Sequence, residues 1–340
     1  MNGNKVVTAS LVIIVVFLFG LLLKVAKPVF FPFFLAVMLY FLMSPALDFL
    51  TRLKIPKAIS IIFLVFITFF LFYLLGALFY SSGKSFAAEL PKYGQRLQSI
   101  INTVQVKLQA PQIDWETVDL TKQFDLGKVG GFVLSSLGPF FSFMANLFLI
   151  FIFLIFILAG RGQVKNKLIK YYPKEKSNRF ITIAEKIDSQ VQRYIAIKTM
   201  VSFFTGVFAG IVLVIWGLDF AIVFAFLTFI LNYIPNIGSF IATVFPVAIA
   251  IFQFETIWPA VWICIILIII QQSMGNFVEP RLMGEGLGLS PLVVIFSLFF
   301  WGWLWGIPGM VLATPITAIV KIVCSNVPEL GVIAALMSKD

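Results

Sequence analysis

Long apolar runs constrain the fold of this chain more than any other feature. The first half contains four of them, at about 6–23, 29–50, 59–80 and 132–159. A helix needs about 20 consecutive apolar residues to cross a bilayer, and hydrocarbon admits only helices or closed barrels because it offers the backbone no hydrogen bonds. We therefore predict an all-α integral membrane protein with about eight transmembrane helices.

Composition supports this class and excludes several others. Hydrophobic residues make up 61% of the chain and charged residues 12%, against roughly 25% charged residues in a soluble domain. There is no histidine, and the two cysteines, Cys264 and Cys324, stand in apolar stretches without metal-ligand or disulfide spacing. No nucleophile has an adjacent base. We expect no metal, no cofactor and no enzymatic activity.

The net charge of +10 is distributed as in a membrane protein rather than a nucleic-acid-binding one. The segment 160–198 carries ten basic and three acidic residues, and the short 52–57 loop is also basic. Cytoplasmic loops carry an excess of Lys and Arg. Both segments are therefore predicted to be cytoplasmic, which places the N-terminus inside and the 81–131 insert outside the inner (plasma) membrane.

The same pattern divides the chain into six segments. In order, they are three transmembrane helices (1–80), an extracytoplasmic helical insert (81–131), a fourth transmembrane helix (132–159), a basic cytoplasmic amphipathic helical segment (160–198), a C-terminal transmembrane half (199–325) and a tail (326–340). Apolar residues of the insert recur in steps of four and three, at Phe86, Leu90, Tyr93, Leu97, Ile100, Val104 and Leu108. This stripe predicts a helix that packs on the external ends of the spans or contacts another subunit.

The C-terminal half is interrupted first at 232–239, within the apolar segment 218–254. The candidate residues of this interruption are Asn232, Pro235, Asn236 and Gly238. Proline removes a backbone donor and glycine permits positive φ, so the chain can leave the helix here. The segment is either two tilted helices joined by an external turn or a re-entrant hairpin, whose buried tip would need a wet cavity or a binding site.

The second interruption, at 276–291, combines charges with helix breakers. Its candidate residues are Asn276, Glu279, Pro280, Arg281, Gly284 and Pro291. Glu279 and Arg281 flank Pro280 and could form a charge-assisted pair. Because ionisable residues at membrane depth are costly and usually functional, this region is either part of a solute or ion pathway or a solvated loop outside the membrane.

Three carboxylates are candidates for ion coupling. Glu279 is the principal one, while Asp219 and Glu255 close the two ends of the 218–254 segment. Without histidine, proton coupling must use carboxylates or water. The alternative for Asp219 and Glu255 is an ordinary position at the level of the lipid headgroups.

Small residues and prolines indicate how other helices pack and bend. The pairs Gly206 with Gly210 and Gly302 with Gly306 form G-x-x-x-G patterns, which let helices approach closely in lipid. Breaks or kinks in the last helix are expected at Gly306, Pro308, Gly309 and Pro315.

Taken in order, these motifs resemble a known family. They are the Pro-Asn-Ile-Gly turn at 235–238, Asn276 with the run 279–284, Leu289-Ser290-Pro291, the run 306–309, and Pro315. Together they resemble the autoinducer-2 exporter (AI-2E) family of permeases over nearly the whole chain. The residues that the resemblance carries over are Pro235, Gly238, Asn276, Glu279, Pro280, Gly284, Pro291, Gly306 and Pro308. Ser290 departs from the histidine expected in many relatives, which puts any role for that histidine in doubt.

The resemblance implies transport without fixing the solute. It associates some members with export of the furanone-type signal autoinducer-2, and others with exchange of sodium or lithium for protons. It also implies a homo-oligomer, with a pentamer as the specific expectation, in which scaffold spans support a mobile part made from the broken segments.

Three functional hypotheses follow. In the first, a secondary transporter exports a small polar organic solute through a site formed by 232–238 and 276–284, where amide and backbone groups bind hydroxyls while Glu279 and Arg281 shape charge or gate access. In the second, Glu279 is the exchanged carboxylate of a cation/proton antiporter. In the third, the protein is a membrane scaffold that transports nothing.

Overall fold

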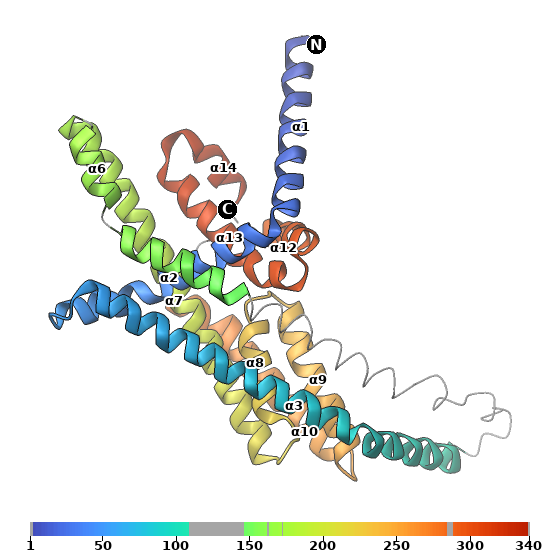
Figure 1. Cartoon of the computed structure of the whole chain (residues 1–340). Coiled ribbons are helices and arrows are strands. Elements are labelled where there is room, and N and C mark those ends of the chain that lie inside the picture. Colours follow the sequence, from blue (N-terminus) through green and yellow to red (C-terminus); the bar gives the residue numbers. More distant parts are fainter. Residues whose placement is uncertain (1–2, 109–145, 162, 172, 284–287, 339–340) are drawn as a thin grey trace.

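The computed structural model describes residues 3–108, 146–161, 163–171, 173–283 and 288–338, and this part of the chain is helical without a β-strand (Figure 1). The predicted all-α class is confirmed. The helices are α1 (Gly3–Val25), α2 (Lys27–Arg52), α3 (Lys57–Leu108), a helix at Asn146–Gly160, α6 (Gln163–Tyr171), α7 (Lys174–Ile215), α8 (Ala221–Leu231), α9 (Ile237–Gln253), α10 (Trp258–Gln272), the π-helix η1 (Ser273–Val278), α11 (Glu279–Met283), α12 (Pro291–Trp305), α13 (Ile307–Asn326), the 3₁₀ turn η2 (Pro328–Leu330) and α14 (Gly331–Leu336).

Two helices run through boundaries that the sequence pattern suggested. The expected limit at 80/81 falls inside α3, and the limit at 198/199 falls inside α7. Neither place has a proline to end the helix. The change from apolar to polar residues therefore marks where a helix leaves the apolar layer, and the helix itself continues. Most of the insert, and residues 132–145 of the expected fourth span, lie outside the described residues.

The first half forms its own packed layer. Buried residues of α2, α3 and the 146–160 helix share one hydrophobic cluster, with Ala36, Leu47 and Leu154 at its centre. The turn between α2 and α3 lies beside the end of the 146–160 helix, where Asp48 accepts a 2.7 Å bond from Arg161. These contacts hold the three helices together at the predicted cytoplasmic loops.

The second half is built from two helical hairpins, α8–α9 and α12–α13, that pack against α7 (Figure 1). On α7, Gly206 and Gly210 face Ala225 of α8 so closely that a Cβ at either glycine would lie 2.7 Å from an Ala225 atom. This G-x-x-x-G pattern is thus used for close helix packing, as expected. The other pattern includes Gly302, which packs against Met310 within the second hairpin.

The two hairpins share a short sequence after their breaks. Residues 238–243 read Gly-Ser-Phe-Ile-Ala-Thr, and residues 309–314 read Gly-Met-Val-Leu-Ala-Thr. In each hairpin the glycine touches the other arm, because a Cβ at Gly238 would lie 1.8 Å from the Leu231 carbonyl oxygen and one at Gly309 would lie 2.0 Å from that of Trp301. The absence of a side chain lets each chain fold back tightly. Gly306 ends α12 with φ +75°, and Pro308 and Pro315 lie within α13.

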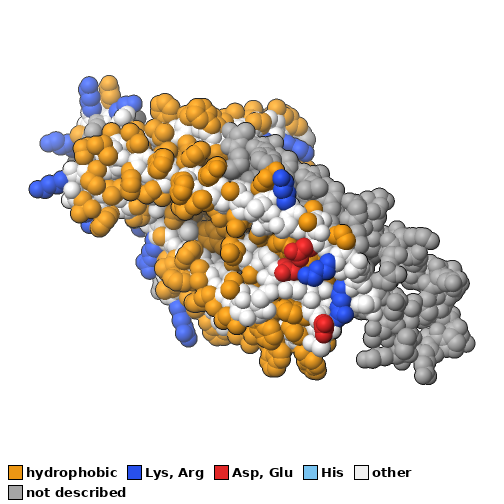
Figure 2. Space-filling view, turned by 60° about the horizontal axis from the view of Figure 1, so that its bottom comes forward, with side chains coloured by type: hydrophobic (Ala, Val, Ile, Leu, Met, Phe, Trp, Pro, Cys, Tyr) orange, Lys and Arg blue, Asp and Glu red, His pale blue; other side chains and the backbone are white. Residues whose placement is uncertain are grey.

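Among the described residues, five helices are long and apolar enough to cross a bilayer, and four further apolar helices are shorter. Helix length alone does not test the expected number of eight spans, which stays a prediction. Figure 2 shows hydrophobic side chains over much of one face, with Lys and Arg at one end and a second group of them beside acidic side chains toward the other. Phenylalanines such as Phe63, Phe66 and Phe156 are more than half exposed, as expected where lipid rather than water covers the protein.

Candidate functional site

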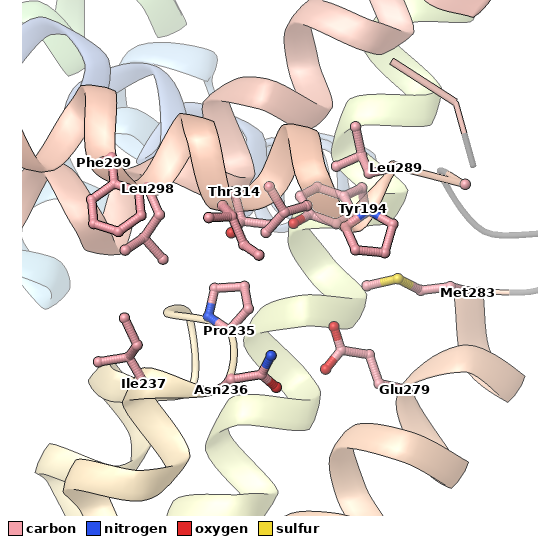
Figure 3. A pocket seen from close by; sticks show the side chains of 14 residues that line it. Tyr194, Pro235, Asn236, Ile237, Glu279, Met283, Leu289, Leu298, Phe299 and Thr314 are labelled. Atoms are coloured by element: carbon pink, nitrogen blue, oxygen red, sulfur yellow. The ribbon is translucent and has the colours of Figure 1, made fainter. Parts of the chain in front are cut away.

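A cavity of about 660 Å³ lies between the tip of the α8–α9 hairpin and the α12–α13 hairpin (Figure 3). Its lining is mostly apolar, with the polar groups of four side chains at intervals. The lining residues are Tyr194, Pro235, Asn236, Ile237, Glu279, Met283, Gly288, Leu289, Pro291, Val294, Ile295, Leu298, Phe299 and Thr314. An apolar cavity with a few convergent polar groups is the usual form of a small-molecule site.

The hairpin tip forms one wall of this cavity. Turn hydrogen bonds satisfy its backbone, including Ile234 N–H to the Leu231 carbonyl at 2.8 Å and Gly238 N–H to the Ile234 carbonyl at 3.1 Å. Asn236 has φ +58° and ψ −52°, a conformation that a residue with a side chain rarely adopts. Backbone strain of this kind concentrates at functional sites, and here the strained residue is exposed and lines the cavity.

Side chains on α7 hold the base of the tip. The Asn232 amide donates to Ser202 Oγ at 3.0 Å, and the hydroxyls of Tyr233 and Thr199 lie 2.7 Å apart. The α8 arm has 11 residues, or about 17 Å of helix, and a bilayer core is about 30 Å thick. The tip lies beside α7, and this arm is shorter than the helix that a full crossing needs.

A buried ion pair lies next to the tip. The Lys198 ammonium of α7 lies 2.9 Å from both carboxylate oxygens of Glu279, and the side chains are 8% and 19% exposed. Removing one partner of such a pair leaves an uncompensated buried charge, which typically costs about 3–5 kcal/mol. In Figure 3, the side chains of Glu279 and Asn236 lie on one side of the cavity, while Thr314, Leu298 and Phe299 lie on the other.

The π-helix η1 sets the direction of Glu279. It joins α10 to α11 as one continuous helical rod, and its i→i+5 bonding inserts an extra residue into a turn. Single π turns inside α-helices are frequent at functional sites. Glu279 follows directly after this turn and faces Lys198.

A second polar cluster lies at the opposite ends of these helices. Tyr93 of α3 donates 2.9 Å to the Asp219 carboxylate, and the Gln253 side chain bridges the Asp219 N–H and the Gly217 carbonyl at 2.8 Å each. Burial and the Asp219 carboxylate raise the pKa of the Tyr93 hydroxyl well above its ordinary value. Arg96 donates to the carbonyls of Phe254 and Glu255. This outer cluster fastens both ends of the α8–α9 hairpin to the extension of α3.

The structure brings together four of the residues that the sequence singled out. Pro235, Asn236, Glu279 and Pro291 all line the one cavity, although they come from two interruptions about 40 residues apart. This convergence is the main support for treating both interruptions as parts of a single site.

Other predicted residues have different surroundings. Asn232 and Gly238 shape the hairpin, as described above. Asn276 bonds locally to Gln272, and Pro280 and Arg281 are exposed on α11. Glu279 pairs with Lys198 instead of the expected Arg281, because α11 directs its glutamate toward α7. Gly284 lies outside the described residues.

Asp219 and Glu255 do not join Glu279. Glu255 precedes α10 and Glu279 follows η1, so a helical rod of roughly 30 Å separates them. Asp219 belongs to the outer cluster at the Glu255 end. The expected grouping of Asp219 and Glu255 with Glu279 is therefore not formed, and the carboxylate that shares the Tyr93 hydroxyl with Asp219 is Glu89. The described residues contain no group of three potential metal ligands.

Sequence reasoning missed Lys198, Tyr194 and Thr314. Lys198 and Tyr194 were grouped with the basic amphipathic segment, and the length of α7 carries Tyr194 to the cavity wall and Lys198 to Glu279. Their spacing of four residues, on one helix face directly before an apolar run, was the available signal. The Thr314 hydroxyl is buried without a hydrogen-bond partner among the described residues. Nothing in the sequence distinguishes it from Thr243.

The C-terminal segment covers the edge of the cavity formed by residues 288–291. Ser290 N–H donates to the Met337 carbonyl at 2.9 Å, and Lys321 donates to the Gly288 carbonyl at 2.8 Å. The expected tail is therefore packed onto the second interruption.

The fold and the cavity define the class of the protein, which is a multi-pass helical membrane permease. Comparison with known sequences gives the family. The chain belongs to the AI-2E family of transporters, whose sequence profile matches residues 11–329. The family resemblance seen in the sequence is thereby confirmed.

Individual relatives match over most of their length. A protein of Borreliella burgdorferi, named only as a candidate transport protein, is 34% identical over 319 residues, or 93% of this chain and 86% of the relative. The AI-2 transport protein TqsA of Escherichia coli strain K12 is 32% identical over 338 residues, or 99% of this chain and 96% of the relative. A candidate transport protein of Haemophilus influenzae is 32% identical over 323 residues.

Proposed function

We propose that this protein is a secondary-transporter-like permease that exports a small polar organic solute through the cavity at the α8–α9 tip. One observation carries the proposal, namely the convergence of Pro235, Asn236, Glu279 and Pro291 on a single cavity inside a family of transporters. The Asn236 amide and the hydroxyls of Tyr194 and Thr314 are suited to bind solute hydroxyls, and the apolar walls exclude water from those bonds.

Autoinducer-2 is the candidate solute. The support is the name of one relative, AI-2 transport protein, which matches 99% of this chain. A cavity of about 660 Å³ has room for such a molecule together with water.

Alternating access would come from the α8–α9 hairpin. Its tip is attached to α7 by two side-chain bonds, whereas its outer ends are fastened to α3. We propose that the tip moves against α12 while α2, α3 and the 146–160 helix form a fixed scaffold. A homo-oligomer, specifically a pentamer, with the N-terminus in the cytoplasm, completes the proposed arrangement.

The test is flux in liposomes containing the purified protein. Autoinducer-2 release would be measured with and without a proton gradient, for the wild type and for the cavity variant Asn236→Ala. Arg281→Ala is the matched control, because Arg281 is exposed next to the same site and does not line the cavity.

We expect flux in the wild type and in Arg281→Ala, and at least a tenfold loss in Asn236→Ala. Equal flux in the wild type and the Asn236 variant would remove the cavity from the pathway. Absent flux together with sodium-dependent proton movement would replace the proposal with cation exchange. Absence of both activities would favour a scaffold role.

A further inference from the structure

The charge of the cavity depends on a residue that does not line it. Among the described residues that line the cavity, Glu279 is the one charged side chain. Both of its carboxylate oxygens lie 2.9 Å from the Lys198 ammonium, which is 8% exposed and lies behind the wall. The negative charge of Glu279, which faces the cavity, is therefore compensated by the positive charge of Lys198, which does not face it.

We infer that Lys198, by neutralising Glu279, restricts this cavity to uncharged, hydroxyl-bearing solutes. This deepens the proposed function and rests on it, because a solute must enter the cavity for its charge to be selected. Lys198 acts through Glu279 and is thus a positioning residue for selectivity, with no direct solute contact required.

The physical argument concerns what a charged solute would lose. An ion that enters a largely apolar cavity gives up much of its hydration and needs a counter-charge to replace it. Here Glu279, the one charge among the described lining residues, already has a partner at bonding distance. The hydroxyl groups of Tyr194 and Thr314 and the Asn236 amide can replace the hydration of an alcohol but not that of an ion.

Two other described charges lie near the cavity. Lys321 is buried on α13, and its ammonium donates to the carbonyl of the lining residue Gly288. Arg281 is exposed on α11. Neither lines the cavity, and both stay unchanged in every variant below, so differences between variants report only Lys198 and Glu279.

The experiment measures the electrostatic potential of the cavity without requiring transport. Cys264 and Cys324 are replaced by alanine, and Asn236→Cys places one thiol at the cavity wall. The reaction rate of this thiol is measured with three methanethiosulfonate reagents: a neutral one, a cationic one with a trimethylammonium group and an anionic one with a sulfonate group. Each reagent forms a mixed disulfide with the thiol and releases methanesulfinate. For each protein, the rate with the cationic reagent is divided by the rate with the anionic reagent. This ratio is then divided by the same ratio measured for a small thiol in solution, and the result reports the electrostatic potential of the cavity.

The background with the intact pair is compared with Lys198→Met, Glu279→Gln and the exchanged pair Lys198→Glu/Glu279→Lys. We expect the intact and exchanged pairs to give a ratio within about threefold of the solution thiol. In Lys198→Met the ratio should rise, and in Glu279→Gln it should fall, each on the order of tenfold, because a lone charge in this setting is weakly screened. A monodisperse size-exclusion profile checks folding of each variant.

Equal ratios in all four proteins would overturn the inference, as would a thiol at position 236 that reacts with no reagent. If the single variants do not fold, the intact pair still decides, because a ratio more than about threefold from the solution value would show a charged cavity and overturn the inference. The reaction rates do not depend on flux. If the thiol reaction rates are as expected but the protein shows no autoinducer-2 flux, the proposed solute pathway is rejected and the inference that the cavity is neutral is retained.

Discussion

The two hairpins of the second half start from similar sequences and end in different surroundings. Each has a Gly-x-x-[Ile/Leu]-Ala-Thr segment after the break, with a glycine in contact with the opposite arm. The tip of α12–α13 is anchored, since the Trp305 indole donates to the Leu23 carbonyl at 3.3 Å and Lys27 donates to the Trp305 carbonyl at 3.0 Å. The tip of α8–α9 instead faces a cavity, with Asn236 exposed.

This difference separates two roles for one motif. Trp305 is fully buried among Phe31, Phe34 and Trp301, so the second hairpin is part of the scaffold. The first hairpin is fastened at its outer ends and keeps a tip with few attachments. The same hairpin motif is thus anchored at its turn in one place and lines a cavity with its turn in the other, and the second arrangement suits the movement that we propose for the α8–α9 tip.

The largest expected effect is on the anchored tip. Trp305→Ala removes a buried indole and its hydrogen bond, and the free energy of unfolding in detergent should fall by about 3–5 kcal/mol. Thermal unfolding of the purified protein measures it. Trp303→Ala is the control, because Trp303 is 55% exposed in the same helix and should cost much less. Equal losses in both variants would mean that the tip is not anchored through Trp305.

The shared glycines should matter in both hairpins. Gly238→Ala and Gly309→Ala each place a Cβ within 2.0 Å of a backbone carbonyl oxygen, which cannot rotate away. We expect a loss of about 3 kcal/mol in each variant, from overpacking of a fixed backbone. Gly20→Ala meets no atom within 4 Å and should be neutral or stabilising. A tolerated alanine at only one of the two sites would show that the hairpins differ in backbone as well as in surroundings.

The outer attachment of the first hairpin should contribute less. Tyr93→Phe keeps the ring in its cluster and removes the bond to the Asp219 carboxylate, so we expect a loss of about 1.5 kcal/mol. The pH dependence of the free energy of unfolding provides a specific test of this hydrogen bond. Because the folded-state pKa of Tyr93 is raised above its ordinary value of 10.0, its contribution is present below pH 10 and is lost as pH rises through the folded pKa. The stability difference between wild type and Tyr93→Phe should therefore stay constant to about pH 10 and shrink above it.

The free tip should give the smallest change, with the opposite sign. Asn236→Gly relieves a positive φ of 58°, so the free energy of unfolding should rise by about 1 kcal/mol while solute flux falls. Asn236→Asp, with a side chain of the same size, is the control that keeps the strain. A glycine variant that is less stable than the wild type would show that the Asn236 side chain holds the tip in place.

The sequence alone predicted the helical fold class, and four of its candidate residues line one cavity, whereas it predicted the contacts of those residues less well. Apolar runs and basic loops defined a polytopic helical protein, and the Pro-Asn and Glu-Pro interruptions located two walls of the cavity. Element limits were less accurate, because α3 and α7 continue as helices past the point where apolar residues give way to polar ones. Hydropathy reports the surroundings of a helix and not its ends.

The partners of Glu279 illustrate what a linear pattern omits. Arg281 is two residues away in sequence, while Lys198 is 81 residues away and is the residue that pairs with it. Neighbours two positions apart on a helix point in different directions, whereas α7 and α11 meet side by side. Asp219 and Glu255 were plausible partners by charge, and the length of α10 and η1 separates them from the site.

With Lys198 neutralising Glu279 as we infer, the π turn before Glu279 would make the selectivity of the cavity sensitive to the number of residues as well as to their identity. Deleting one residue between Ser273 and Val278 would restore regular α-helical hydrogen bonding. The deletion would rotate Glu279 by about 100° around the helix axis. The carboxylate would leave Lys198, and a lysine with no counter-ion would remain beside the cavity. A single deletion here could thus convert a neutral pathway into one that attracts anions, with every residue of the site still present.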